Sequence, residues 1–130
     1  MKLLIAEDSD LIVARLLGML NDAAGVQEIK TTGTLADTLT VVEQISPDLL
    51  VLDFHLPDGD APRILMNLKK IAPRMMIAVF TNDDSPYNRT RSLQAGADWF
   101  FNKSTDFEVL TTLVQLCALN SVDSEQLART

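Results

Sequence analysis

Short aliphatic runs recur along the chain, and each is apolar at successive positions instead of alternating with polar residues. Four clear runs lie at residues 3–6, 49–52, 75–80 and 99–101, and a more polar one lies at 27–31. Strands that are apolar on both faces are typical of a parallel sheet covered by helices on its two sides. The mixed run suits an edge of that sheet, where fewer side chains are buried. The pattern therefore predicts five parallel strands.

Segments with helical spacing of apolar residues separate these runs. Residues 10–23 predict the first helix, because Ile12, Leu16 and Leu20 share one stripe. Four further helices are predicted to begin near Thr34, Asp60, Ser85 and a capping box formed by Thr105 and Glu108. The helix after Ser85 is polar almost all round, so little apolar surface would hold it to the sheet. Five strands alternating with five helices predict a three-layer α/β sandwich with right-handed crossovers.

Length and composition exclude several classes of protein. The 130 residues suit one domain, expected at 1–120 and followed by a polar tail or linker stub at 121–130. Eleven Lys and Arg against 18 Asp and Glu give a net charge of −7, which argues against nucleic-acid binding by this chain. One Cys and one His exclude a disulfide framework and a four-ligand zinc site of nitrogen and sulfur. With a single Cys we expect a reducing, cytoplasmic setting. No segment reaches the length of a membrane span.

Polar side chains follow four of the predicted strands. Glu7 and Asp8 follow the first, Asp53 the third, Thr81 the fourth, and Lys103 lies just beyond the fifth. The carboxyl ends of parallel strands lie at one edge of the sheet, so these side chains should converge there. Ligands in such folds bind at that edge. Three neighbouring carboxylates require a cation, and oxygen ligands favour Mg²⁺. An ammonium, a hydroxyl and a metal around one carboxylate are the components that stabilise a phosphoryl group in transfer.

These residues lie in five short motifs that occur in a fixed order. The motifs are LLIAEDS, LLVLDFHLPDG, VFTN, AGAD and WFFNKS. Together they make residues 1–119 resemble the receiver domain of bacterial two-component response regulators. The resemblance implies a flavodoxin-like fold whose five-stranded parallel sheet has the order 2-1-3-4-5.

The resemblance assigns a phosphoacceptor and a metal site. It implies that Asp53 attacks the phosphohistidine of a sensor histidine kinase or phosphotransfer protein and becomes an aspartyl phosphate. Asp8, Asp53 and the main-chain carbonyl of His55 would bind Mg²⁺ or Mn²⁺ directly, and Glu7 would act through a water. A domain of this kind catalyses its own phosphotransfer and dephosphorylation, and is not a turnover enzyme.

The resemblance also implies a conformational switch. Thr81 and Lys103 would contact the phosphoryl oxygens, Thr81 would move toward them, and Phe100 would rotate inward. These movements would reshape the surface of the fourth helix, fifth strand and fifth helix, where a downstream protein target binds. We expect a monomer or a phosphorylation-dependent dimer.

Four positions bear on the lifetime and geometry of the phosphorylated site. His55 and Asp83 each lie two residues beyond a site residue, where we expect them to influence hydrolysis of the phosphate. Asn82 occupies a position where the family usually has a small residue, and it would narrow access to the phosphate. Ser104 stands where a proline after a cis peptide is usual, so this loop either holds a strained cis peptide without proline or adopts a trans form that shifts Lys103.

Simpler interpretations exist for single residues. Asp53 alone suits a turn before Pro57, Glu7 and Asp8 suit a helix start, and Lys103 suits a solvated surface. Their occurrence in one ordered set favours the phosphoryl site.

Alternative functions remain open on the sequence. The chain can be the receiver portion of a longer DNA-binding regulator. An aspartyl-phosphate phosphohydrolase needs a second Asp where His55 stands, and a flavin binder needs a phosphate loop at residues 7–10, which hold three acids. A phosphorylation-independent interaction module would not need Asp8, Asp53, Thr81 and Lys103 to be intact.

Overall fold

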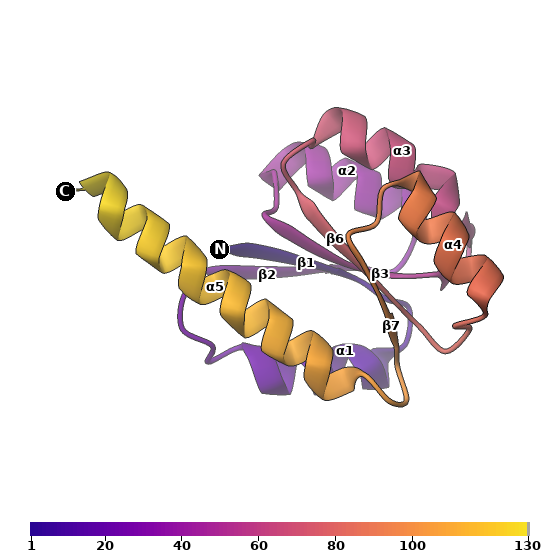
Figure 1. Cartoon of the computed structure of the whole chain (residues 1–130), viewed down its shortest axis with the longest axis horizontal. Helices are drawn as coiled ribbons and strands as arrows, with labels where there is room; N and C mark the ends of the chain where they lie inside the picture. Colours follow the sequence, from indigo (N-terminus) through magenta and orange to yellow (C-terminus); the bar gives the residue numbers. More distant parts are fainter. Residues whose placement is uncertain (130) are drawn as a thin grey trace.

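Five parallel strands form the central sheet of this computed structural model (Figure 1). They are β1 (Lys2–Ala6), β2 (Glu28–Thr32), β3 (Leu49–Asp53), β6 (Met76–Thr81) and β7 (Trp99–Asn102). Their order is β2-β1-β3-β6-β7, which confirms the flavodoxin-like order expected from the sequence. The structure describes the backbone of residues 1–129 and the side chains of residues 1–120.

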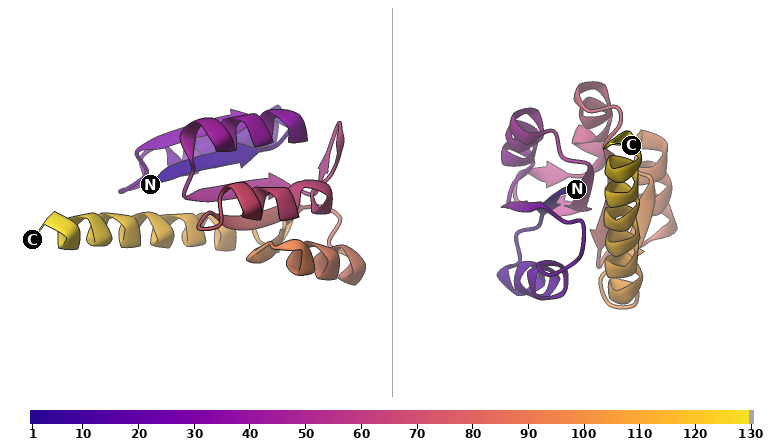
Figure 2. Two further views of the ribbon diagram at one scale, coloured as in Figure 1. Left: turned by 90° about the horizontal axis from the view of Figure 1, so that it is seen from above. Right: turned by 90° about the vertical axis from the view of Figure 1, so that its left-hand side faces the viewer.

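The helices form a layer on each face of the sheet, as the end-on view in Figure 2 shows. One layer contains α1 (Asp10–Leu20) and α5 (Phe107–Arg129), and the other contains α2 (Leu35–Ile45), α3 (Pro62–Ile71) and α4 (Pro86–Ala95). Successive strand residues face opposite layers. On β7, Phe100 packs in the core under α2 and α3, whereas Trp99 and Phe101 pack on the side of α1 and α5.

A short hairpin that the aliphatic pattern did not predict follows β3. It consists of β4 (His55–Leu56) and β5 (Gly59–Asp60), which pair antiparallel. The carboxylate of Asp58 in its turn accepts hydrogen bonds from Leu35 N at 2.7 Å and Ala36 N at 3.0 Å. These bonds cap the start of α2 and lower the pKa of Asp58. The hairpin beside the predicted phosphoacceptor is therefore fastened to a helix of the sandwich.

The fifth helix differs from its expected bounds at both ends. It begins at Phe107, with the Asp106 carbonyl accepting from Leu110 N, so the predicted capping box at Thr105 is wrong. It continues to Arg129, beyond the expected end near residue 120, and its last turns extend past the sheet (Figure 2). Residues 108–129 contain no Gly or Pro that would end a helix.

Helix α4 is held to the sheet by polar side chains, as its composition predicts. Its buried residues are Asn88 and Ser92. Asn88 Nδ2 donates to the Asp83 carbonyl at 3.3 Å, but the fully buried Ser92 Oγ has no hydrogen-bond partner among the described residues. An unpaired buried hydroxyl destabilises a fold by about 1–3 kcal/mol.

We expect Ser92→Ala to raise the free energy of unfolding by at least about 1 kcal/mol, because it removes this hydroxyl and favours the helix. Chemical denaturation measures the change. Thr90→Ala on the exposed side of α4 is the control, since it alters helix propensity alone. Equal gains from the two substitutions would show that the Ser92 hydroxyl carries no cost.

No helix within the described residues is both long enough and apolar enough to cross a membrane.

Candidate functional site

Three carboxylates meet at the carboxyl ends of β1 and β3. Glu7 and Asp8 directly follow β1, and Asp53 is the last residue of β3, which pairs with β1. Each offers an oxygen that lies within 4.8 Å of the others'. Glu7 and Asp53 are buried and Asp8 is exposed, so the group extends from the interior to the surface of the protein.

Lys103 is the cation paired with these acids. Its Nζ lies 2.6 Å from Glu7 Oε2 and 3.0 Å from Asp53 Oδ2, and its side chain is only 8% exposed. A backbone hydrogen bond fixes the main chain at this position, since Lys103 N donates to the Thr81 carbonyl at 2.9 Å. Three carboxylates against one ammonium leave the site net negative, which favours a bound cation.

Burial and charge act against each other in this group. Burial raises the pKa of Glu7, the Lys103 hydrogen bond opposes that shift, and the charge of Asp53 adds to it, so that the pKa is raised overall. Burial disfavours the charged form of Lys103, but the hydrogen bond that Lys103 donates to Glu7 and the charge of Asp53 outweigh it and raise the Lys103 pKa. Lys103 therefore remains an ammonium at neutral pH.

The donor set suits a hard divalent cation. Glu7, Asp8 and Asp53 supply oxygen ligands only, and Mg²⁺ prefers one or two carboxylates together with waters. Exposed Asp8 leaves one side of the group open to solvent, where such waters can remain. The residues therefore fit the metal that the sequence predicted.

Thr81 ends β6 next to Asp53 on the neighbouring strand, and it is buried. Its Oγ1 accepts from Asp83 N at 3.0 Å, which leaves the hydroxyl proton available to another acceptor. Glu7, Asp8, Asp53 and Lys103 thus lie in one cluster. The Thr81 hydroxyl contacts the loop after β6 through Asp83 N.

His55, two residues beyond Asp53, bridges two acids. Its Nδ1 lies 2.7 Å from Asp60 Oδ1, and its Nε2 lies 2.9 Å from Asp83 Oδ2. Ionised carboxylates only accept hydrogen bonds, so the form of His55 that satisfies both is the imidazolium. The hydrogen bonds that His55 donates to Asp83 and Asp60 raise the pKa of His55, and His55 lowers the pKa of Asp83.

Asp60 was not predicted to be a partner of His55. The sequence pattern indicated only a helix start near Asp60, because the hairpin that brings its side chain to His55 has no aliphatic pattern. The signal available was an acid five residues beyond a histidine, separated from it by the turn residues Pro57 to Gly59.

The remaining predicted positions lie around this group. Phe100 is buried, and its carbonyl accepts from Arg89 Nη1 of α4 at 3.4 Å. Asn82 Oδ1 accepts a long hydrogen bond of 3.5 Å from Ser104 Oγ, so the residues that directly follow Thr81 and Lys103 lie together. No peptide bond of the described backbone is cis, and Lys103 therefore meets the acids with a trans peptide before Ser104.

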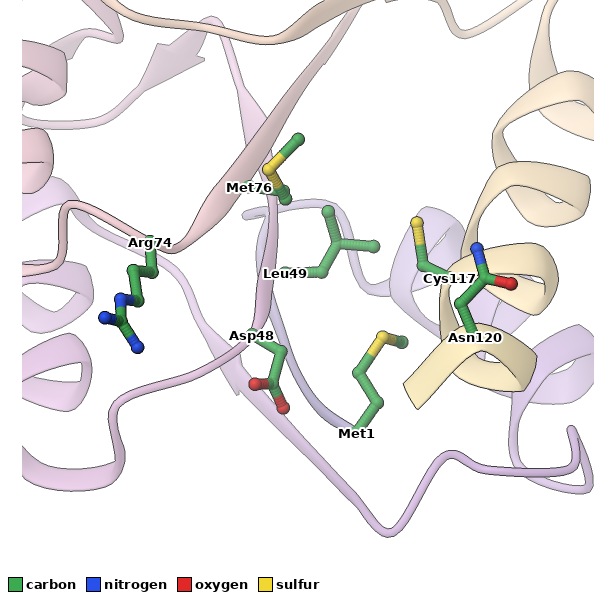
Figure 3. A pocket seen from close by; sticks show the side chains of 7 residues that line it. All are labelled: Met1, Asp48, Leu49, Arg74, Met76, Cys117 and Asn120. Atoms are coloured by element: carbon green, nitrogen blue, oxygen red, sulfur yellow. The ribbon is translucent and has the colours of Figure 1, made fainter. Parts of the chain in front are cut away.

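A separate hollow of about 300 Å³ lies at the opposite, amino-terminal ends of the strands (Figure 3). Its lining residues are Met1, Asp48, Leu49, Arg74, Met76, Cys117 and Asn120. Asp48 Oδ2 accepts from Lys2 N at 2.7 Å, so that this acid fastens the start of β1. The hollow does not include any of the converging site residues.

The model of the response regulator receiver domain matches residues 3–115. The chain belongs to this family. Among curated relatives, the response regulator GacA of Pseudomonas aeruginosa is 25% identical over 114 residues, covering 88% of this chain and 53% of GacA. The receiver domain thus spans about half the length of that relative.

Solved structures share the fold of this receiver domain. The CheY-like receiver domain protein of Methanospirillum hungatei matches with a TM-score of 0.82 at 24% identity, covering 95% of this chain and 97% of the other. The Mn(2+)-bound form of response regulator Rcp1 matches with a TM-score of 0.75 at 20% identity, covering 88% of each chain.

Proposed function

We propose that this receiver domain accepts a phosphoryl group on Asp53 from the phosphohistidine of a sensor histidine kinase or phosphotransfer protein. The observation that carries the proposal is the buried Lys103 ammonium, held 3.0 Å from Asp53 Oδ2 beside two further carboxylates. A cation fixed at a carboxylate in this way stabilises the charge that develops when that carboxylate attacks phosphorus.

In the proposed transfer, an Asp53 oxygen forms the new bond to phosphorus while the bond from the donor's histidine nitrogen breaks. The released imidazole takes a proton from solvent. Lys103 and the Thr81 hydroxyl donate to the phosphoryl oxygens, and burial of the carboxylate keeps bulk water from competing. The later attack of water returns free phosphate and Asp53.

We assign the divalent cation to Glu7, Asp8, Asp53 and the main-chain carbonyl of His55, with Glu7 acting through a water. Bound Mg²⁺, or Mn²⁺, would neutralise the acids and the phosphoryl charge. His55, Asn82 and Asp83 border the phosphate and tune its hydrolysis. Unchanged dephosphorylation after replacing both His55 and Asp83 with Ala would contradict that role.

Mg²⁺ should stabilise the chain, and Asp8→Asn should largely remove the effect, because it deletes a proposed direct ligand. A ligand at about 100 times its dissociation constant adds about 2.7 kcal/mol to stability. Thermal unfolding with and without Mg²⁺ measures the shift. Asp10→Asn, at an exposed neighbouring acid outside the cluster, should keep it. An Mg²⁺-dependent shift that survives in Asp8→Asn would place the ion elsewhere.

We propose that phosphorylation draws Thr81 toward the phosphoryl group and changes the packing of Phe100. The surface of α4, β7 and α5, which is the fourth helix, fifth sheet strand and fifth helix of the sequence analysis, then binds a downstream protein. The polar packing of α4 supports this, since few apolar contacts resist its movement. A phosphorylation-dependent dimer and a cytoplasmic location remain predictions.

A second candidate is the receiver portion of a longer DNA-binding regulator. The partial coverage of GacA favours it, because about half of that relative has no counterpart in this chain. Residues 1–120 would then be the receiver, and residues 121–130 would lead toward the next domain, with α5 continuing as far as Arg129. A gel-shift assay with the product of the full reading frame distinguishes the two forms.

The test of the main proposal is incubation with Mg²⁺ and a small acyl phosphate, followed by intact mass measurement. We expect the mass to increase by one phosphoryl group, and the increase to require Mg²⁺. The absence of an adduct would contradict the proposed function.

A further inference from the structure

We propose that the Asp60–His55–Asp83 bridge is a clasp that holds the loop after β6, and with it α4, in the resting position. The inference rests on the proposed function, in which Thr81 moves toward a phosphoryl group on Asp53. It concerns the conformation of the chain before phosphorylation, and so differs from an effect on phosphate hydrolysis.

The clasp joins two segments that no strand pairing connects. Asp60 and His55 belong to the β4–β5 hairpin, which forms its own small sheet, and Asp83 lies in the loop after β6. His55 contacts both acids through opposite sides of its ring, at 2.7 Å and 2.9 Å. The hairpin itself is anchored to α2 through Asp58, so the clasp fastens a loop to a fixed support.

Asp83 connects the clasp to the switch elements. Its carboxylate binds His55, its backbone N–H donates to Thr81 Oγ1 at 3.0 Å, and its carbonyl accepts from Asn88 Nδ2 of α4 at 3.3 Å. If Thr81 turns toward a phosphoryl group, the bond from Asp83 N–H is lost. The loop and the first turn of α4 are then released together, unless His55 keeps Asp83 in place.

Helix α4 is the element able to take a second position. Its buried face contains Asn88, bound to the clasped loop, and Ser92, whose hydroxyl has no partner among the described residues. The buried side chains of α4 are therefore polar, and one of them, that of Ser92, makes no hydrogen bond to the described residues. A contact outside the helix can therefore shift its equilibrium between positions.

The clasp should shift that equilibrium by a modest factor. His55, Asp60 and Asp83 are each about half exposed, and exposed ion pairs have small effects. Only the His55–Asp83 pair spans the hairpin and the loop, and one such pair corresponds to a bias of up to about fivefold. A ligand that binds only the activated position would gain affinity by the same factor when the clasp is removed.

The test uses the full chain with His55→Ala, which keeps the main-chain carbonyl, and Asp83→Asn, which keeps the backbone bonds to Thr81 and Asn88. Amide hydrogen exchange, followed by NMR without ligand, should become faster by up to about fivefold at residue 83 and along α4. Amides of α1 should not change. Lys30→Ala, which removes the exposed Lys30–Glu28 pair, is the matched control.

The second readout is the affinity for beryllofluoride with Mg²⁺, a phosphoryl mimic, followed by Trp99 fluorescence. Both clasp variants should bind it tighter than wild type by the factor seen in exchange. Unchanged exchange at residue 83 and α4 in both variants would overturn the clasp. Failure of the wild-type chain to bind beryllofluoride would contradict the proposed function instead, and the exchange rates would still decide the clasp.

Discussion

Asp53→Asn should take up no phosphoryl group from an acyl phosphate in the presence of Mg²⁺, where the wild-type chain is phosphorylated. The amide that replaces the carboxylate is a poor nucleophile, and it removes a negative charge from the proposed metal site. Neither Glu7 nor Asp8 is expected to substitute, since Glu7 is engaged by Lys103 and Ser9 N and Asp8 is exposed.

The measurement is intact mass after incubation, with circular dichroism to verify the fold of the variant. Asp22→Asn, the same change at an exposed acid distant from the cluster, is the control and should be phosphorylated like wild type. An adduct of equal size on Asp53→Asn would mean that another residue is the acceptor and that the assignment of Asp53 is wrong.

Lys103→Met should lower the free energy of unfolding at neutral pH by about 3–5 kcal/mol. The substitution retains an apolar side chain but leaves buried Glu7 and Asp53 without their shared cation. Removal of one partner from a buried ion pair leaves an uncompensated charge, and that charge is the source of the loss. Phosphorylation should also become much slower, since the ammonium no longer faces the phosphoryl oxygens.

The defect should depend on pH in a defined direction. Burial already raises the pKa of Glu7 above its ordinary value, and loss of Lys103 removes an opposing contribution. The folded variant then binds protons more tightly than the unfolded chain, so its stability falls as pH rises through the folded pKa and recovers as pH is lowered. Mg²⁺ should restore part of the loss at neutral pH.

Urea denaturation at neutral and mildly acidic pH measures both effects. Lys30→Met is the matched control, because Lys30 pairs with Glu28 at 3.7 Å on the surface and should contribute at most about 1 kcal/mol. If Lys103→Met is as stable as wild type at neutral pH, the Lys103 ammonium does not stabilise the buried carboxylates of Glu7 and Asp53 as the geometry implies.

The fold was predictable because its signal is local. Runs that are apolar on successive positions identify four strands buried on both faces, and the mixed run at 27–31 identifies an edge strand; all five were placed to within one residue at each end. The short hairpin at His55–Leu56 and Gly59–Asp60 was missed, since two-residue strands leave no periodicity. The end of α5 was missed because polar residues continue a helix where no Gly or Pro ends it.

The residue types of the site were predictable for a related reason. In a parallel sheet every strand ends at the same edge, so residues just beyond Ala6, Leu52 and Phe80 had to meet there. That argument places Glu7, Asp8, Asp53 and Thr81 without knowledge of any loop. The family resemblance added their roles, and the receiver domain match at residues 3–115 confirms the family.

By itself the sequence determined the α/β class, the strand order through its family, and the edge of the sheet where the acids gather. Only the tertiary structure decided that Lys103 contacts both Glu7 and Asp53, and that His55 joins Asp60 to Asp83. The physical reason is separation along the chain. Lys103 lies 50 residues from Asp53 and His55 lies 28 from Asp83, and such contacts depend on loop paths and side-chain rotamers that periodicity does not encode.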